Sequence, residues 1–99
     1  MPGYKLAPSA DKDIEAIVRY TLKKWGKDQN DRYIASLIEC FEQIAAGKIV
    51  DRSLNGTNKN LFFVRCGHHY IFYLRNQNPV VIVRVLHERM DLVQQIKDV

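Results

Sequence analysis

The stretch LFFVRCGHHYIFYLRNQNPVVIVRVLH, residues 61–87, bears most directly on the fold because it contains three short runs of β-branched and aromatic residues. Gly67-His68 separates the first two runs, and a polar turn that ends in Asn78-Pro79 separates the last two. Short breaks of this kind join neighbouring antiparallel strands. The sequence therefore predicts a three-stranded antiparallel meander with strands at Leu61–Cys66, Tyr70–Arg75 and Val80–His87.

Side chains alternate along a strand, which sorts the predicted meander into two faces. The first face is apolar and is expected to receive helices; it carries Phe62, Val64, Ile71, Tyr73, Val81, Val83 and Val85. The second face mixes apolar and basic side chains, namely Leu61, Phe63, Arg65, Tyr70, Phe72, Arg84 and Leu86. Because no element of the sequence is left to cover the second face, we expect it to stay open for a partner.

The sequence upstream of the meander begins with a short extended segment over residues 4–7 and continues into a helix. Ser9 is placed to cap this helix at its start, and Gly26 offers a left-handed cap at its end. Between them, apolar residues recur at the spacing of one buried helical stripe. The stripe consists of Ile14, Ile17, Val18, Thr21, Leu22 and Trp25.

A second helix is predicted between Asp28, which is placed to cap it, and Gly47. Its apolar stripe consists of Tyr33, Ile34, Leu37, Ile38, Phe41, Ile44 and Ala45. Only a few residues separate the two predicted helices, between Gly26 and Asp28. A link this short forces the helices antiparallel, as a helical hairpin. We expect the core to contain Leu22, Trp25, Leu37 and Phe41. Residues 47–60 read as a loop, and residues 92–99 could add a short helix.

Composition limits the class of protein. A chain of 99 residues that is 46% apolar and 26% charged fits one globular domain over residues 1–99. No apolar run reaches the roughly 18 residues of a membrane span, and the N-terminus lacks the apolar core of a signal peptide. We therefore expect a soluble, cytoplasmic protein. The net charge of +4 suggests an anionic partner, either nucleic acid or an acidic protein.

The two cysteines, Cys40 and Cys66, are too few for a disulfide scaffold and have no CxxC spacing. The simplest interpretation is a pair of reduced thiols that act as small packing residues. His68 and His69 are interpreted as turn histidines, because no carboxylate or cysteine stands at a metal-ligand spacing from them. We expect no metal and no cofactor.

His87 is the residue most open to a catalytic interpretation, because Glu88 and Arg89 follow it at the end of the last strand. A general base and a phosphate-binding arginine could meet there in an RNA-cleaving site. Surface charges at a strand end are the alternative. Arg65 and Arg84 could bind carboxylates or phosphates through the planar guanidinium group, or could be solvated arginines of a sheet. The residues alone predict a small basic α+β binding domain with a helical hairpin on an antiparallel sheet.

Three segments resemble the ParE branch of the RelE/ParE toxin superfamily. They are YKLAPSADKDIEAIVRYTLKKWG, residues 4–26; DRYIASLIECFEQIA, residues 31–45; and HHYIFYLRNQNPVVIVRVLHERMDL, residues 68–92. The resemblance implies a β-α-α-β-β-β chain and the toxin component of a type II toxin–antitoxin system, neutralised by a cognate acidic antitoxin. It also implies two candidate activities: RelE-like relatives are ribosome-dependent mRNA endonucleases, whereas ParE-like relatives inhibit DNA gyrase.

The predicted second face favours gyrase inhibition. By ungapped matching of the strands, Leu61, Phe63 and Tyr70 stand where the RNA-cleaving relatives carry basic groups. A ribonuclease here would depend on His87, Arg89, Arg65 and Arg84. A silent or regulatory binding module is the third class considered. We expect no membrane contact and no sequence-specific nucleic-acid binding by the toxin alone.

The expected binding residues follow from the same faces. The antitoxin is expected on Leu61, Phe63, Arg65, Tyr70, Phe72 and Arg84, and the target on Arg89 and Leu92.

Overall fold

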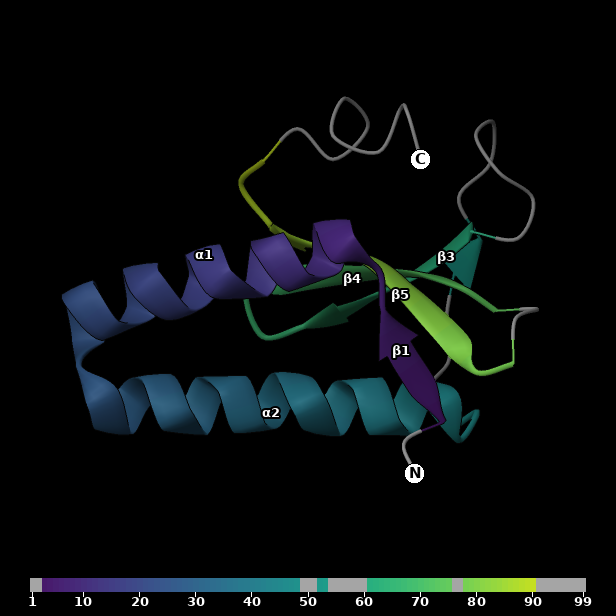
Figure 1. Ribbon diagram of the computed structural model, residues 1–99, viewed down its shortest axis with the longest axis horizontal. Coiled ribbons are helices and arrows are strands. Elements are labelled where there is room, and N and C mark those ends of the chain that lie inside the picture. The colour runs from purple at the N-terminus through teal and green to yellow at the C-terminus, as the bar shows by residue number, and fades with distance from the viewer. Residues whose placement is uncertain (1–2, 49–51, 54–60, 76–77, 91–99) are drawn as a thin grey trace.

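Figure 1 shows the computed structural model of the chain, which describes residues 3–48, 52–53, 61–75 and 78–90. Two long helices, α1 (Pro8–Trp25) and α2 (Lys27–Ala45), run antiparallel beside a five-stranded sheet. The predicted α+β fold with a helical hairpin on a small sheet is confirmed.

The sheet has the strand order β1-β5-β4-β3-β2. Strands β3 (Leu61–Cys66), β4 (His69–Leu74) and β5 (Val80–His87) form the predicted antiparallel meander. The short N-terminal strand β1 (Tyr4–Leu6) pairs parallel to β5, as the resemblance implied. The predicted loop at residues 47–60 contains a further two-residue strand, β2 (Arg52–Ser53), which pairs with β3.

Both helix starts differ from the prediction. The first helix begins at Pro8, after Ala7, and Ser9 does not cap it. Instead the Ser9 hydroxyl donates a hydrogen bond to the Val83 carbonyl oxygen at 2.7 Å, which fastens the helix to β5. Proline suits the first helical position because its missing N–H would have no partner there.

Gly26 is the whole connection between the helices, so Asp28 lies inside the first turn of α2 and does not cap it. The backbone of Gly26 has φ +90°, a conformation that side chains disfavour. Because the connection is a single residue, α2 begins directly after the end of α1 and runs antiparallel to it.

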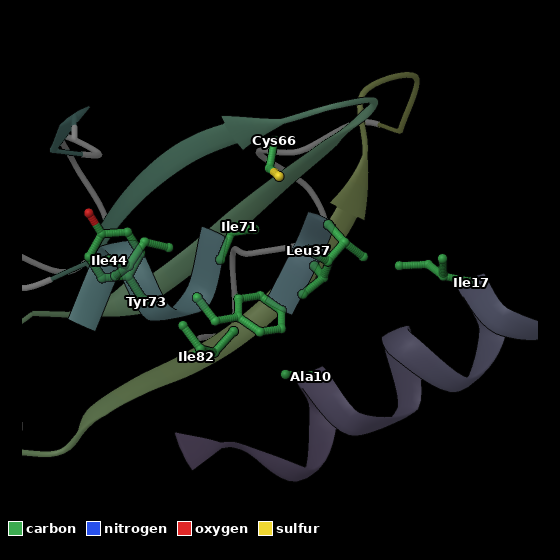
Figure 2. Close-up of a cluster of buried hydrophobic side chains, with 10 residues drawn as sticks. Ala10, Ile17, Leu37, Ile44, Cys66, Ile71, Tyr73 and Ile82 are labelled. Carbon is green, nitrogen blue, oxygen red and sulfur yellow. The ribbon is translucent and has the colours of Figure 1, made fainter. Parts of the chain in front are cut away.

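The core between the hairpin and the sheet contains those residues of the two helix stripes that lie over the sheet. Ala10 and Ile17 of α1 and Leu37 and Ile44 of α2 belong to this core, and Figure 2 shows Ile17 pointing toward Leu37 and Ile44 lying beside Tyr73 of the sheet. Leu37 and Phe41 are about 1% exposed, as predicted. Leu22 and Trp25 were predicted in the core, and this is wrong: they are 43% and 62% exposed. The hairpin extends past the sheet, so none of the described strands covers the last turns of α1 (Figure 1).

An irregular register in β5 moves two valines to the other face. Phe72 pairs with Arg84 and Tyr73 pairs with Ile82, so Val83 has no partner of its own. An extra residue of this kind shifts the alternation of the strand. Ile82 therefore faces the helices, while Val81 and Val83 belong to the cluster on the opposite face. Their assignment to the helix face was wrong.

The second face is not open at its centre. Leu61, Phe72 and Leu86 are at most 1% exposed, which contradicts the predicted open face. Large neighbours account for part of this burial, because the Phe63 ring lies 5.8 Å from Phe72 and 6.0 Å from Tyr70, between ring centroids. Phe63 and Tyr70 themselves are partly buried.

Cys40 of α2 and Cys66 of β3 form a disulfide, so the prediction of reduced packing thiols is wrong. The two residues are 26 positions apart in the chain. Only the packing of the helix on the sheet brings them together, and no spacing motif reveals such a pair. The bond joins α2 to the sheet.

Within the residues that the structure describes, no helix is long and apolar enough to cross a membrane.

Candidate functional site

A groove of about 910 Å³ lies where the hairpin extends past the sheet. One wall is the C-terminal half of α1, and the N-terminal turns of α2 close its end. The other wall is the β3–β4 turn together with the end of β5. A volume of this size is typical of ligand and partner sites.

Two exposed aromatic side chains, Tyr20 and Trp25, stand on the α1 wall with Lys24 between them. The Lys24 ammonium donates a hydrogen bond to the Tyr20 hydroxyl at 3.0 Å. It also lies 5.5 Å from the centre of the Tyr20 ring and 5.7 Å from that of Trp25. Cation–π contacts of this kind contribute about 0.5–1 kcal/mol each at exposed positions, so Lys24 favours this arrangement of the two rings.

Tyr33 of α2 fastens the β3–β4 turn to the hairpin. Its hydroxyl accepts a hydrogen bond from the His68 backbone N–H at 3.1 Å and donates one to His69 Nδ1. Gly67 makes this approach possible, because a Cβ at Gly67 would lie 3.0 Å from the Tyr33 ring.

His69 is buried and neutral. It begins β4, so its assignment as a turn residue was wrong, whereas His68 lies in the turn as predicted. Burial lowers the pKa of His69 to about 4, and the neighbouring His87 and His68 add to this effect. Since Nδ1 accepts from Tyr33, the hydrogen-bond network assigns the ring proton to Nε2.

Glu88 is held by two partners at the end of β5. Arg65 forms an ion pair with it, and His68 Nδ1 lies 2.9 Å from its second carboxylate oxygen. The hydrogen bond from His68, followed by the charge of Arg65, lowers the pKa of Glu88. Both partners are more than half exposed, which limits the strength of these pairs.

His87 lies between the other two histidines. Its ring meets that of His69 edge-on at 5.2 Å and stacks on that of His68 at 6.4 Å, between centroids. Its Nδ1 accepts a hydrogen bond from the Arg89 backbone N–H at 3.1 Å. The described residues nevertheless contain no group of three or more potential ligands arranged to hold a metal ion.

The sequence placed Arg84 on the expected open face of the sheet, but in the structure its side chain forms an ion pair. It binds Asp13 of α1 through two nitrogens, at 2.8 Å and 3.1 Å, and both side chains are largely buried. Asp13 also accepts a hydrogen bond from the Val85 N–H at 2.9 Å. Arg84 therefore joins α1 to β5 through Asp13, which lines the groove.

The predicted site residues are divided between two surfaces. His87 and Arg89 line the groove, and Arg65 reaches its edge through Glu88. Leu61, Phe63, Tyr70 and Phe72 belong to the cluster on the second face of the sheet. Leu92 lies outside the described residues. The sequence analysis missed Tyr20, Lys24 and Tyr33; a tryptophan and two lysines at a helix end were the available signal for the α1 wall.

Comparisons of this chain with protein families, with related sequences and with solved structures agree with this fold. Residues 4–92 match the family described as "ParE toxin of type II toxin-antitoxin system, parDE". "Toxin ParE" of Escherichia coli is 39% identical over 99 residues, covering 99% of this chain and 96% of the relative. "Toxin ParE1" of Mycobacterium tuberculosis is 31% identical over 90 residues, covering 90% and 92%.

A solved structure titled "Chromosomal ParDE TA system from P. aeruginosa" has the same fold, with a TM-score of 0.72 over 88% of this chain and 96% of that one. Its sequence identity is 13%, so the likeness concerns the fold alone.

The fold and the matches define a toxin of a type II toxin–antitoxin system, whose partner is a protein antitoxin. The chain belongs to the ParE toxin family. The resemblance seen in the sequence is thereby confirmed.

Proposed function

We propose that this toxin arrests growth by binding and inhibiting DNA gyrase, and that it acts as a binding protein without cutting RNA. Membership of the ParE family supports the first half of the proposal. The second half rests on the ion pairs of Arg65 and Arg84, two of the three arginines that a nuclease site was predicted to use.

RNA cleavage by a 2′-hydroxyl needs a general base, an acid for the leaving oxygen and cations around the phosphorane. Here the guanidinium of Arg84 is committed to Asp13, and that of Arg65 is committed to Glu88. A carboxylate beside each arginine repels an incoming phosphate. This arrangement favours inhibition by binding.

The histidine cluster favours the second candidate, a ribosome-dependent mRNA endonuclease. His87 and His68 face one another in the groove, and Arg89 follows His87. An imidazole near neutral pH is the usual general base. In this alternative, His87 would take the proton and Arg89 would contact the phosphate.

The antitoxin is proposed to bind the second face of the sheet, where Phe63 and Tyr70 are partly accessible beside the exposed Arg65. An acidic antitoxin segment would place apolar side chains on the two rings, and its carboxylates would have to compete with Glu88 for Arg65. Leu61, Phe72 and Arg84 would support this surface from below rather than touch the partner. These roles remain predictions.

One experiment separates the two candidates. Purified toxin is incubated with gyrase, relaxed plasmid and ATP, and in parallel with translating ribosomes and a defined message. We expect loss of supercoiling at toxin concentrations that leave the message intact. The His87→Ala variant should keep its inhibition within about tenfold, whereas loss of a general base would lower a cleavage rate by roughly 10²- to 10⁴-fold. Cleaved message with untouched supercoiling would replace the proposal by the alternative.

A further inference from the structure

The helical hairpin carries a further surface on the side of α1 that faces away from the groove. We infer that this surface binds a second copy of the same chain, which is turned end for end about a two-fold axis near Val18. The inference goes beyond the proposed function, because it involves neither the target nor the antitoxin.

The first support is an apolar seam along the line where the two helices meet. In an antiparallel hairpin, residues at equal distances before and after the connection lie opposite one another, which places Val18 beside Ile34. A hollow of about 170 Å³ brings Ile14 and Ile38 together one turn further from the connection. With Leu22, which is 43% exposed, these side chains form the apolar seam. Ile38 is 41% exposed, so solvent reaches the seam at both ends.

The apolar seam and the groove lie on different sides of α1. Side chains advance by about 100° per residue around a helix, so Leu22 points about 160° away from Tyr20, which lines the groove. Among the described residues that line the groove, none belongs to the seam. The second face of the sheet is separate as well, because the hairpin packs on the opposite face. A second copy on the seam therefore leaves both surfaces accessible.

The second support is a stripe of charges beside the seam. Asp11 and Glu15 are followed at the same four-residue spacing by Arg19 and Lys23. All four side chains are exposed, and none of them takes part in an ion pair among the described residues. Asp11, Glu15 and Arg19 each lie three residues before an apolar residue of the seam, and residues three apart are neighbours on a helix surface. The stripe is therefore acidic in the first half of α1 and basic toward the connection.

A two-fold interface requires a surface that complements itself. When two of these stripes run antiparallel about an axis near Val18, Glu15 of each copy meets Arg19 of the other. The same arrangement brings Leu22 of each copy to Ile14 of the other, beside the hollow. Favourable interaction with the helix dipole accounts for charges in the first and last turns of a helix. It does not account for Glu15 and Arg19, which lie in the middle of α1.

Other occupants match the stripe less well. An acidic antitoxin segment or a nucleic-acid strand would be attracted to Arg19 and Lys23 but repelled by Asp11 and Glu15. The net charge of +4 opposes self-association only weakly, because at physiological salt exposed charges more than about 8 Å apart are largely screened.

The seam is short, so the association should be weak, with a dissociation constant on the order of 10–100 μM. Folding free energies measured below about 5 μM therefore report on the monomer. Sedimentation velocity between about 5 and 500 μM follows the association of each variant.

Charge reversal tests the contact across the axis. In Arg19→Glu or in Glu15→Arg, like charges meet twice in the dimer, so each variant should associate at least about tenfold more weakly than wild type. An equimolar mixture of the two variants should restore association. In that mixture the Arg19→Glu copy offers only carboxylates at the two positions, and the Glu15→Arg copy offers only guanidinium groups.

The apolar seam has its own variant and controls. Leu22→Ser should weaken association by at least about tenfold, because the interface contains this side chain twice. Met90→Ser alters an apolar residue of the same 43% exposure at the end of β5. Arg32→Glu reverses an exposed charge of α2 away from the seam. Both controls should stay within about twofold of wild type. The substituted residues are exposed, so the variants should fold, and melting temperature checks this.

Four results would overturn the inference. The first is a wild-type chain that stays monomeric up to about 500 μM. The second is a mixture of the two charge variants that associates no better than either variant alone. The third is an equal loss of association in seam variants and controls, which would place the contact elsewhere. The fourth is a loss of affinity for the cognate antitoxin, measured by calorimetry, in Arg19→Glu and Leu22→Ser while self-association is unchanged; the seam would then belong to the antitoxin.

Discussion

The two ends of the helical hairpin both carry apolar stripes but have opposite surroundings. Over the sheet, Leu37 and Phe41 are buried, whereas Leu22 and Trp25 of the same apolar pattern face solvent at the projecting end. Helix α1 has 18 residues, a length of about 27 Å, and its last turns project past the strands on which its first half packs (Figure 1). An apolar stripe shows which face of a helix can be buried; the position of the neighbouring strands decides how much of that face is buried.

The largest expected effect is at the buried end. Truncation of a buried phenylalanine leaves a cavity and costs about 3–5 kcal/mol, so Phe41→Ala should lose a large part of the folding free energy. Urea unfolding followed by circular dichroism measures this loss. A destabilisation below about 1 kcal/mol would show that the buried end is not the stability centre of the hairpin.

The Cys40–Cys66 disulfide should contribute somewhat less. It ties the buried half of α2 to the sheet, and its two cysteines are 26 positions apart; closing a loop of this length in the unfolded chain stabilises by about 3.5 kcal/mol in the chain-entropy model. Reduction with dithiothreitol should therefore lower the melting temperature, and Cys40→Ser with Cys66→Ser should melt at the same lower temperature. Free-thiol titration before and after reduction is the control; equal melting of oxidised and reduced protein would contradict the expectation.

Acid should destabilise the contact that ties the hairpin to the β3–β4 turn. The pKa of His69 is about 4 in the folded protein and about 6.5 in an unfolded chain. Between these values the unfolded state binds the additional proton, so stability falls as pH falls through this window. The loss between pH 7 and pH 5 should be about 2 kcal/mol by urea unfolding.

His69→Gln serves as the matched variant for this pH dependence. It is less stable at neutral pH because it loses the bond from Tyr33. Its stability should nevertheless change less between pH 7 and pH 5 than that of wild type. An equal slope in both proteins would assign the acid sensitivity to other groups.

The smallest effect is expected at the projecting end. Trp25→Ala removes a large side chain that solvent already reaches, so the folding free energy should change by less than about 0.5 kcal/mol. Leu22→Ala should behave alike. A loss near that of Phe41→Ala would mean that the projecting end is covered in solution, by a second copy or by a bound partner, and sedimentation velocity would identify which.

Much of the fold could be predicted because local signals agreed with it. The apolar periods, Gly26 and the short break at Gly67 give both helices and the meander. The bulge in β5 could not be predicted, because the run Val80–Val83 is apolar on both faces and carries no alternation to reveal a shift. Burial of Leu22 and Trp25 was overpredicted because periodicity carries no information on what covers a stripe.

The candidate site could be predicted only in part. His87 and Arg89 were singled out from their place at a strand end, and both line the groove. The partners that decide their chemistry come from elsewhere: Asp13 is 71 positions from Arg84, and Tyr33 is 36 positions from His69. Such pairs depend on how the hairpin packs on the sheet. The Cys40–Cys66 bond was missed for the same reason.

The one-residue joint at Gly26 also makes chain length critical at the tip of the hairpin. Connections between helices are usually the places where a protein accepts insertions. Here only Gly26 lies between Trp25 and Lys27. An inserted residue would have to lengthen one of the helices, which would rotate the side chains that follow it by about 100° around the helix axis. The tip that carries Trp25 is therefore a rigid corner of the molecule, where side chains can be exchanged freely but residues cannot be added.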